Sequence, residues 1–145
     1  MAKIDMSSLK VLVIDDEDFM RKLIGRVLHD IGVREIVLAE NGAQGLGSVQ
    51  ALGSQIDVII CDLEMPTMNG TEFVGNLRKL PDQKMARIPV VILTGHSDEE
   101  HIVGVVEQGI NGYLVKPVAK KALEARLSNA IMGPMIDPSK LKRKT

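Results

Sequence analysis

The chain has 145 residues, 45% of them hydrophobic but only 2% aromatic, and a formal net charge of −1 at pH 7. This length suits one compact domain with an aliphatic core. The near-neutral net charge argues against electrostatic binding of nucleic acid by the domain as a whole. Apolar runs stay far shorter than the ~20 residues that cross a bilayer, and the N-terminus lacks a signal-peptide core, so we expect a cytoplasmic protein.

Strand-like apolar runs alternate five times with helix-length segments along the chain. The strand-like runs are, in order, 11–14, 35–39, 58–61, 90–93 and 113–115. The helical segments run from Met20 to Ile31, from Asn41-Gly42 toward Leu52, from about Thr71 to Leu80, onward from a capping box at 97–100, and from about Ala119 to Ile131. A polar connection is expected between Pro81 and Pro89. This alternation predicts an α/β fold, a doubly wound five-stranded parallel sheet with helices on both faces, in the flavodoxin-like strand order 2-1-3-4-5.

Polar side chains stand where four of these strands end. Asp15 and Asp16 follow the first strand, Asp62 the third, Thr94 the fourth and Lys116 the fifth. Ligands of open parallel sheets gather at the carboxyl ends of the strands, so these side chains are expected to meet at one edge. Carboxylates ~4 Å apart repel by about 4 kcal/mol per pair at an effective dielectric of about 20, and a bound cation relieves this repulsion. Hard oxygen donors without histidine or thiolate favour Mg²⁺ over zinc.

This set of residues, in this order, resembles the receiver domain of bacterial response regulators, of the chemotaxis type that stands as a single domain. The motifs that carry the resemblance are Ile14-Asp15-Asp16, Cys61-Asp62-Leu63-Glu64-Met65-Pro66, Leu93-Thr94-Gly95 and Lys116-Pro117. The receiver is expected to span residues 9–131, close to the size of one average domain. In this interpretation residues 1–8 form an N-terminal lead and residues 132–145 form a disordered basic tail.

The resemblance implies that Asp62 is the phosphoacceptor. Its carboxylate would attack the phosphoryl group of a phosphohistidine and form an acyl phosphate. Lys116 and Thr94 would assist catalysis by contacting the phosphoryl oxygens, and Lys116 would precede Pro117 through a cis peptide. Thr94 and Tyr113 would form the switch, in which the threonine moves toward the phosphoryl group and the tyrosine turns inward.

The resemblance also implies a Mg²⁺ site and two tuning positions. Asp16 and Asp62 would ligate the metal directly, Asp15 directly or through water, and the backbone carbonyl of Glu64 would complete the protein ligands. The side chains of Glu64 and His96 would flank the phosphoryl group and tune how fast water removes it. His96 is interpreted equally well as a polar loop residue.

Partners follow from the same resemblance. A histidine kinase or a histidine phosphotransfer protein would supply the phosphoryl group. A downstream protein would then bind the fourth predicted helix, the fifth strand and the fifth helix. The domain would not be an enzyme beyond assisting its own phosphorylation and dephosphorylation, and it would contact neither nucleic acid nor a membrane directly.

Other classes of protein share parts of this residue pattern. A haloacid-dehalogenase-like phosphatase also combines aspartates, a threonine, a lysine and Mg²⁺, but its nucleophile lies on the first strand and its acidic pair comes late. Here the acidic pair comes first, and Asp62 is followed two places on by Glu64 instead of a second aspartate. A flavodoxin-like flavin binder needs a phosphate-cradling loop after the first strand, where this chain is acidic. A receiver cut from a longer multidomain protein stays an open alternative.

Overall fold

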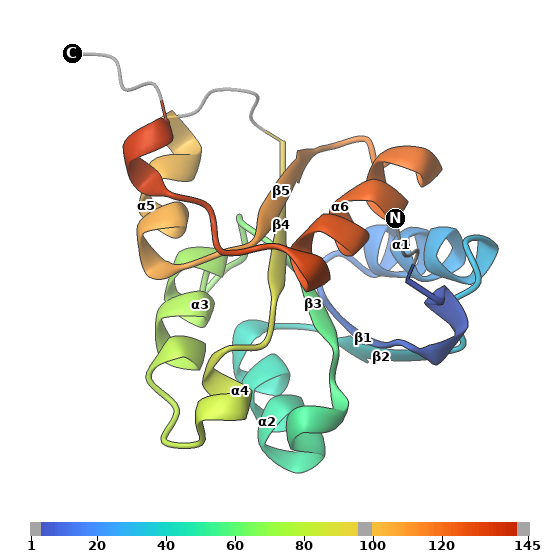
Figure 1. The fold of residues 1–145 in the computed structure, drawn as a ribbon, viewed down its shortest axis with the longest axis horizontal. Helices are drawn as coiled ribbons and strands as arrows, with labels where there is room; N and C mark the ends of the chain where they lie inside the picture. The colour runs from blue at the N-terminus through green and yellow to red at the C-terminus, as the bar shows by residue number, and fades with distance from the viewer. Residues whose placement is uncertain (1–3, 96–99, 142–145) are drawn as a thin grey trace.

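Five parallel strands form one sheet at the centre of the computed structural model, which describes residues 4–95 and 100–141 (Figure 1). The strands are β1 (Lys10–Ile14), β2 (Glu35–Ala39), β3 (Val58–Asp62), β4 (Val90–Thr94) and β5 (Gly112–Val115). Their order is β2-β1-β3-β4-β5 and every neighbouring pair is parallel, so the predicted topology is confirmed. Every residue of β3 and β4 is buried, as expected for central strands that are covered on both faces.

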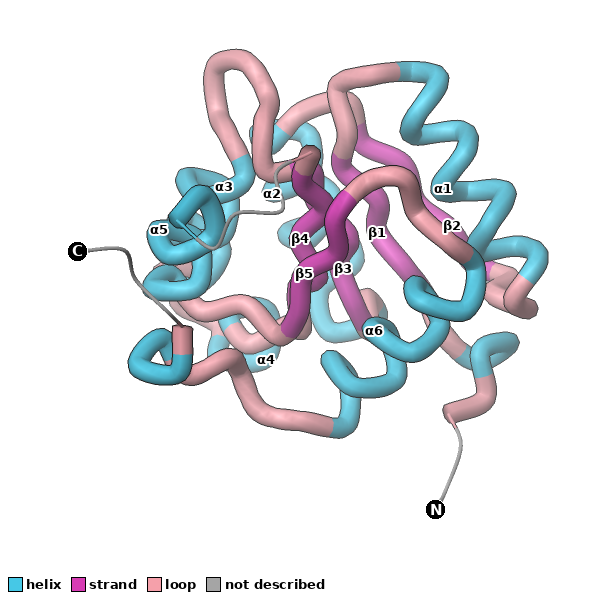
Figure 2. The backbone as a smooth tube through the Cα atoms, turned by 90° about the horizontal axis from the view of Figure 1, so that it is seen from above, coloured by secondary structure: helices cyan, strands magenta, loops and turns pink. Residues whose placement is uncertain are grey.

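Helices cover both faces of the sheet (Figure 2). They are α1 (Asp18–Asp30), α2 (Gly42–Leu52), α3 (Gly70–Arg78), α4 (Gln83–Ala86), α5 (Glu100–Gln108) and α6 (Lys120–Met132). Side chains of α1 and α6 pack with Val11 and Val13 of β1 on one face, and those of α2, α3 and α5 pack with Leu12 and Ile14 on the other. Because successive strand residues point to opposite faces, β1 contributes to two separate apolar layers.

The exit of β3 is held in place by the start of α3. A Cβ atom on Gly70 would lie 2.7 Å from the backbone oxygen of Asp62 and 2.8 Å from Cα of Leu63, so only glycine allows this close approach. Asn69 and Glu72 cap the first turn of α3 reciprocally, each side chain accepting from the other residue's backbone N–H. The backbone after Asp62 is therefore fixed by packing and by a capping box.

The prediction of a polar connection between Pro81 and Pro89 is wrong in part, because this segment contains the short helix α4. Asp82 caps the helix by accepting hydrogen bonds from the backbone N–H groups of Lys84 (2.8 Å) and Met85 (3.2 Å). Ala86 at its end is buried. Tertiary burial of one small residue stabilises a helix that is too short to show a periodic pattern in the sequence.

Residues 133–141 pack on the domain, in contrast to the disordered tail that the sequence predicts from residue 132. A 3₁₀ turn covers Pro138–Lys140. Ile136 and Leu141 pack against the apolar cluster formed by α2, α3 and α5. Burial of these two side chains offsets the entropy lost by ordering the segment. Residues 142–145 of the predicted tail lie outside the described residues.

Two further predictions concern residues that the structure describes only in part. The capping box predicted at 97–100 lies mostly outside the described residues, so its hydrogen bonds stay a prediction. Within residues 4–95 and 100–141, no helix has the length and apolar character needed to cross a membrane.

Candidate functional site

The carboxyl ends of the strands bring the predicted polar residues together. Asp15 and Asp16 after β1 and Asp62 at the end of β3 each offer a carboxylate oxygen, and these oxygens lie within 4.8 Å of one another. Lys116, which follows β5, places its Nζ 3.3 Å from Oδ2 of Asp62 and 3.9 Å from Oδ2 of Asp15. Thr94 ends β4 and is fully buried. Three carboxylates and one ammonium thus share the sheet edge at which the sequence placed them.

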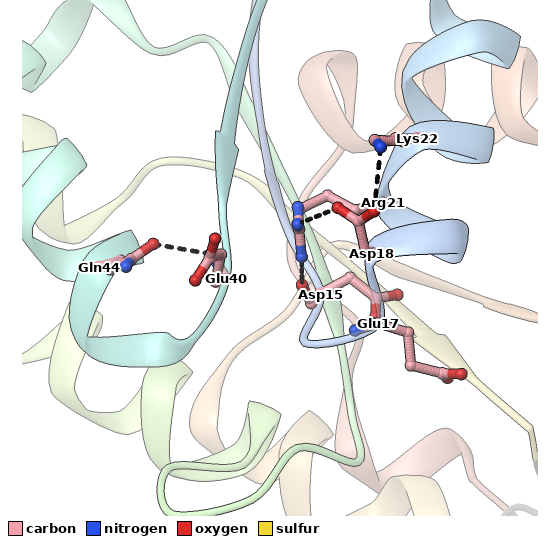
Figure 3. A network of polar contacts seen from close by, with 7 residues as sticks. All are labelled: Asp15, Glu17, Asp18, Arg21, Lys22, Glu40 and Gln44. Carbon is pink, nitrogen blue, oxygen red and sulfur yellow. Dashed lines mark hydrogen bonds and ion pairs between the residues drawn. The ribbon is translucent and has the colours of Figure 1, made fainter.

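Asp15 is held at three points by its neighbours, two of which, Glu17 and Arg21, are drawn in Figure 3. Its backbone N–H donates to the carbonyl of Ala39 (3.2 Å), and its Oδ1 accepts from the backbone N–H of Glu17 (2.9 Å). Its backbone carbonyl accepts from Nη1 of Arg21 (2.8 Å), while Nη2 of the same guanidinium donates to Asp18 (2.7 Å). The remaining oxygen, Oδ2, is buried and receives no hydrogen bond from the described residues. These contacts orient the carboxylate and leave one buried oxygen unsatisfied.

Arg21 is a neighbour of the site that the sequence analysis did not single out. It is only 8% exposed, although it carries a full charge. On α1 it stands in line with Ile24 and Leu28, both fully buried, at the i, i+3 and i+7 positions. A cation on the apolar stripe of a helix requires buried hydrogen-bond partners, so this interruption of the pattern was the available signal. The buried carbonyl of Asp15 is such a partner, and the carboxylate of Asp18, which is exposed, is a second one.

Burial raises the proton affinity of two of the three carboxylates. It raises the pKa of Asp15 from 3.8 to about 6, against the hydrogen bond from Glu17, which lowers it. Burial also raises the pKa of Asp62, against the nearby Lys116 ammonium, which lowers it. Both shifts mean that the ionised carboxylates are incompletely compensated by the protein, and a bound cation would supply that compensation.

The acidic cluster fits a divalent cation that prefers oxygen ligands. The buried Asp15 and Asp62 and the exposed Asp16 offer carboxylate oxygens at mutual distances that one ion can bridge. The Oδ2 of Asp15 receives no hydrogen bond from the described residues and is available as a metal ligand, with the Lys116 ammonium 3.9 Å away. Carboxylate donors suit Mg²⁺ or Ca²⁺ better than zinc, which favours histidine and thiolate. The residues therefore form a candidate metal site.

Asp62 is positioned between its own turn and Lys116. Its Oδ1 accepts from the backbone N–H of Glu64 (3.3 Å), whose side chain is exposed. The backbone N–H of Lys116 donates to the carbonyl of Thr94 (2.8 Å), which ties the loop after β5 to the end of β4. The Lys116–Pro117 peptide bond is cis. Only 18% of the Lys116 side chain is exposed, so its charge acts in a partly desolvated place.

Thr94 and Tyr113 point to the same face of the sheet. In the ladder between β4 and β5, Ile92 pairs with Tyr113 and Thr94 pairs with Val115. Side chains two residues apart share a face, so Thr94 faces the same way as Ile92, and Tyr113 packs against the cluster that contains Ile92. Tyr113 is half-buried on the edge strand. His96, the second predicted tuning residue, lies outside the described residues.

An open cleft of about 360 Å³ lies beside Asp16. Its walls come from the loops after β1, β2 and β3, and its lining residues are Asp16, Glu40, Asn41, Ala43, Pro66, Thr67 and Met68. Thr67 has φ of 70°, a left-handed conformation that β-branched residues rarely adopt. No local pattern in the sequence predicts this cleft, because its shape depends on how three separate loops meet. The cleft therefore opens beside one member of the acidic cluster, Asp16.

The fold and the site together match a known family of proteins. The family model of the response regulator receiver domain matches residues 11–128. The chain belongs to that family. This receiver is a phosphoacceptor module of two-component signalling, as the sequence predicted.

Named relatives are similar to this receiver over most of its length. Chemotaxis protein CheY-3 of Vibrio cholerae is 29% identical over 120 residues, which make up 83% of this chain and 89% of the relative. Chemotaxis protein CheY1 of Helicobacter pylori is 30% identical over 119 residues, 82% of this chain and 94% of the relative. The solved structure of Vibrio cholerae CheY4 matches with a TM-score of 0.75 and 32% identity, covering 84% of this chain and 98% of that one. A receiver domain protein from Clostridium thermocellum matches with a TM-score of 0.76 and 32% identity, covering 85% and 94%.

Proposed function

We propose that this receiver accepts a phosphoryl group on Asp62 from the phosphohistidine of a histidine kinase or a histidine phosphotransfer protein. The observation that carries the proposal is the position of the Asp62 carboxylate, which belongs to the acidic cluster and lies 3.3 Å from Nζ of Lys116. Asp15 is locked by its own backbone contacts, and Asp16 is exposed. Asp62 is thus the acid that combines a central position with a close counter-charge.

The proposed transfer is a displacement at phosphorus. An oxygen of the Asp62 carboxylate bonds to phosphorus while the P–N bond to the donor histidine breaks. The imidazole leaves with the electron pair of that bond and takes up a proton, so an acyl phosphate forms without any oxidation or reduction. Charge spreads over the phosphoryl oxygens in the transition state, and the protein mainly positions groups and neutralises this charge. Lys116 supplies one of the neutralising charges.

Mg²⁺ is the proposed cofactor of the acidic cluster. Asp16 and Asp62 would hold it directly and Asp15 directly or through water, with the backbone carbonyl of Glu64 as a further ligand. When bound, the ion would reduce repulsion among the carboxylates and neutralise charge on the phosphoryl oxygens. The unsatisfied Oδ2 of Asp15 and the raised pKa values of Asp15 and Asp62 support a cation at this place.

Thr94 and Tyr113 are the proposed switch. The Thr94 hydroxyl would donate to a phosphoryl oxygen, which moves the exit of β4 inward, and Tyr113 on the same face would turn with it. Their shared orientation on neighbouring strands supports this coupling. Glu64 and His96 are proposed to tune the lifetime of the acyl phosphate by holding or blocking the attacking water.

The downstream partner is proposed to bind α5, β5 and α6, which are the fourth helix, fifth strand and fifth helix of the sequence prediction. The named relatives are chemotaxis proteins, which supports a chemotaxis-type receiver. In this proposal the receiver, spanning residues 9–131, catalyses nothing beyond its own phosphorylation and dephosphorylation. It signals to a protein and not to nucleic acid, in line with a net charge of −1.

Intact-mass measurement with acetyl phosphate tests the assignment of Asp62. The wild-type chain should gain one phosphoryl adduct in the presence of Mg²⁺ and none in EDTA, and Asp62→Asn should gain none. Asp57→Asn is the matched control, because Asp57 accepts a hydrogen bond from the backbone N–H of Lys10 (2.8 Å) at the opposite end of β3. This control should label like the wild type. A labelled Asp62→Asn chain would exclude Asp62 as the acceptor.

A further inference from the structure

Residues 133–141, which we call the C-terminal strap, lie beyond the part of the chain that matches the receiver family. The family model ends at residue 128, and 84% of this chain already covers 98% of the CheY4 structure. In Figure 1 the strap is the red segment that leaves α6, crosses in front of the sheet near β5 and reaches α5. Figure 2 shows the same path from α6 to the side of the sheet where α5 lies. The strap is therefore an addition to the shared fold, and it lies on that fold.

Beyond the hydrogen bond that the backbone N–H of Gly133 donates to the carbonyl of Asn129 at the end of α6 (2.8 Å), the strap is attached by a backbone hydrogen bond of Ile136 and by apolar side chains. The backbone N–H of Ile136 donates to the carbonyl of Ile110 (2.8 Å), two residues before β5 begins. The side chains of Ile136 and Leu141 pack against the apolar cluster on the α5 side. Met135 lies over Gly109, where an added Cβ would be 3.0 Å from its sulfur. The chemistry of the attachment is that of a short peptide with aliphatic anchors.

The strap lies on the surface that the proposed function gives to the downstream partner. A shallow cleft of about 230 Å³ on this surface is bounded by β5, α6 and the strap, and it is lined by Asn111, Gly112, Tyr113, Arg126, Asn129 and Ile136. Tyr113, the proposed switch aromatic, and Ile136 of the strap are thus two walls of one cleft. A partner that contacts Tyr113 through this cleft also contacts Ile136 of the strap.

The attachment is small enough to be displaced. Met135 remains 38% exposed, and Ile136 and Leu141 are only half-buried. Most of the hydrogen bonds of the strap are internal, such as those from the backbone and hydroxyl of Ser139 to Asp137 (2.9 and 2.8 Å). Segments held by few buried contacts open locally without unfolding the domain.

We propose that the C-terminal strap is an intramolecular occupant of the α5–β5–α6 surface, and that a protein partner docks by replacing it with a short segment carrying similar aliphatic anchors. This inference rests on the proposed function in one respect, namely that the downstream partner binds to that surface. The strap itself shows which chemistry the surface accepts: bulky aliphatic side chains beside a backbone N–H aimed at the Ile110 carbonyl. The apparent affinity for the partner is then the intrinsic affinity multiplied by the fraction of molecules in which the strap is detached.

A dye-labelled peptide with the sequence of residues 133–141 is the probe, and fluorescence anisotropy against the full-length chain is the measurement. The wild-type chain should bind the peptide weakly, because its own strap occupies the site. Ile136→Asp in the chain should weaken the strap and raise the affinity for the peptide at least tenfold. Leu141→Asp, near the end of the strap, should raise the affinity in the same way. It keeps the prediction testable if the Ile136→Asp chain misfolds. Equal binding by the wild type and both folded variants, or no binding by any of them, would overturn the proposal.

Two controls separate this inference from the proposed function. Lys140→Asp places an acid at an exposed strap position with no part in the apolar packing, and it should leave peptide affinity at the wild-type value. A labelled peptide carrying the Ile136→Asp change should not bind the opened chains, and binding by it would overturn the role of the anchors. The same samples are tested with acetyl phosphate: a wild-type chain that fails to label contradicts the phosphoacceptor assignment, whereas the peptide result reports on the strap alone.

Discussion

The Asp15 carboxylate lies in surroundings that favour its neutral form. It is fully buried, one of its oxygens has no hydrogen bond among the described residues, and burial raises its pKa to about 6. Near neutral pH the group is therefore ionised at a cost to the folded state. Such a cost is expected of a cation site, since the residues that bind the ion best are those that repel one another without it.

We expect Asp15→Asn to stabilise the metal-free protein at about pH 7.5 by roughly 1–3 kcal/mol. The folded pKa of about 6 lies above the ordinary value of 3.8, so the folded state binds this proton more tightly. The contribution of Asp15 to stability is complete below the ordinary pKa and is lost as the pH rises through about 6. Urea unfolding in EDTA should show the gain at neutral pH and little gain near pH 4. A gain of the same size at both pH values would show that ionisation is not its cause.

Helix α2 shows how residues that look alike in sequence differ once an element is packed. A Cβ atom on Gly45 would meet the side chain of Ile14 and would lie 3.1 Å from the ring of Phe73, and both of these side chains are fully buried. A Cβ atom on Gly47, two residues on, would meet nothing within 4 Å. One glycine allows α2 to approach the sheet near the end of β1, and the other only weakens the helix.

Alanine at these two positions should therefore change stability in opposite directions. Gly47→Ala should stabilise the protein by about 0.5–1 kcal/mol, because alanine favours the helix and has room. Gly45→Ala should destabilise it by about 1–3 kcal/mol, because the added methyl group crowds a filled core. Urea unfolding of both variants beside the wild type measures the two effects. Stabilisation by Gly45→Ala would show that the core near Ile14 has spare volume.

In the molecule as a whole, the acidic cluster lies at one end of the sheet and a structural cluster of hydrogen bonds around Arg78 lies at the other. Arg78, at the end of α3, donates to the carbonyls of Gly109 (2.8 Å), Ala86 (2.8 Å) and Ile88 (2.7 Å), and to Oδ1 of Asn111 (3.4 Å). These partners precede β4 and β5 or end α4. Burial lowers the Arg78 pKa to about 10, so the side chain remains charged at neutral pH. One guanidinium thus joins the entries of two strands, far from the carboxyl ends that hold the aspartates.

Replacing Arg78 should lower the free energy of unfolding without preventing formation of the phosphoryl adduct. Arg78→Met should lower the free energy of unfolding by about 2–4 kcal/mol, because it leaves several carbonyls without a donor in a partly buried place. Arg87→Met, at an exposed neighbouring arginine, should change it by less than about 0.5 kcal/mol. The remaining folded Arg78→Met protein should still form the Mg²⁺-dependent phosphoryl adduct. Loss of labelling by a folded Arg78→Met chain would contradict this separation of the two ends.

The parts of the fold that the sequence predicted are those with a strong local signal. The strands that end at Asp62 and Thr94 are continuous apolar runs, and α1 has an apolar stripe at helical spacing that begins near Met20. The parts that it missed depend on contacts between distant residues. Helix α4 rests on the burial of Ala86 and on a side-chain cap, and the strap rests on Ile136 meeting Ile110. Neither contact leaves a period in the sequence.

The amino-acid sequence by itself determined the doubly wound topology and the set of residues at its functional edge. Alternating strands and helices with right-handed crossovers allow few arrangements, and parallel strands bring Asp15, Asp62 and Lys116 to one side. Only the tertiary structure decided the electrostatic state of that edge, because the pKa of Asp15 depends on its burial, on the hydrogen bond from the backbone N–H of Glu17, and on the charges of Asp62 and Lys116. It also decided the course of the C-terminal strap. A short segment with few apolar residues is ordered only when the domain offers a matching apolar surface. That surface is formed by helices and strands that lie elsewhere in the sequence.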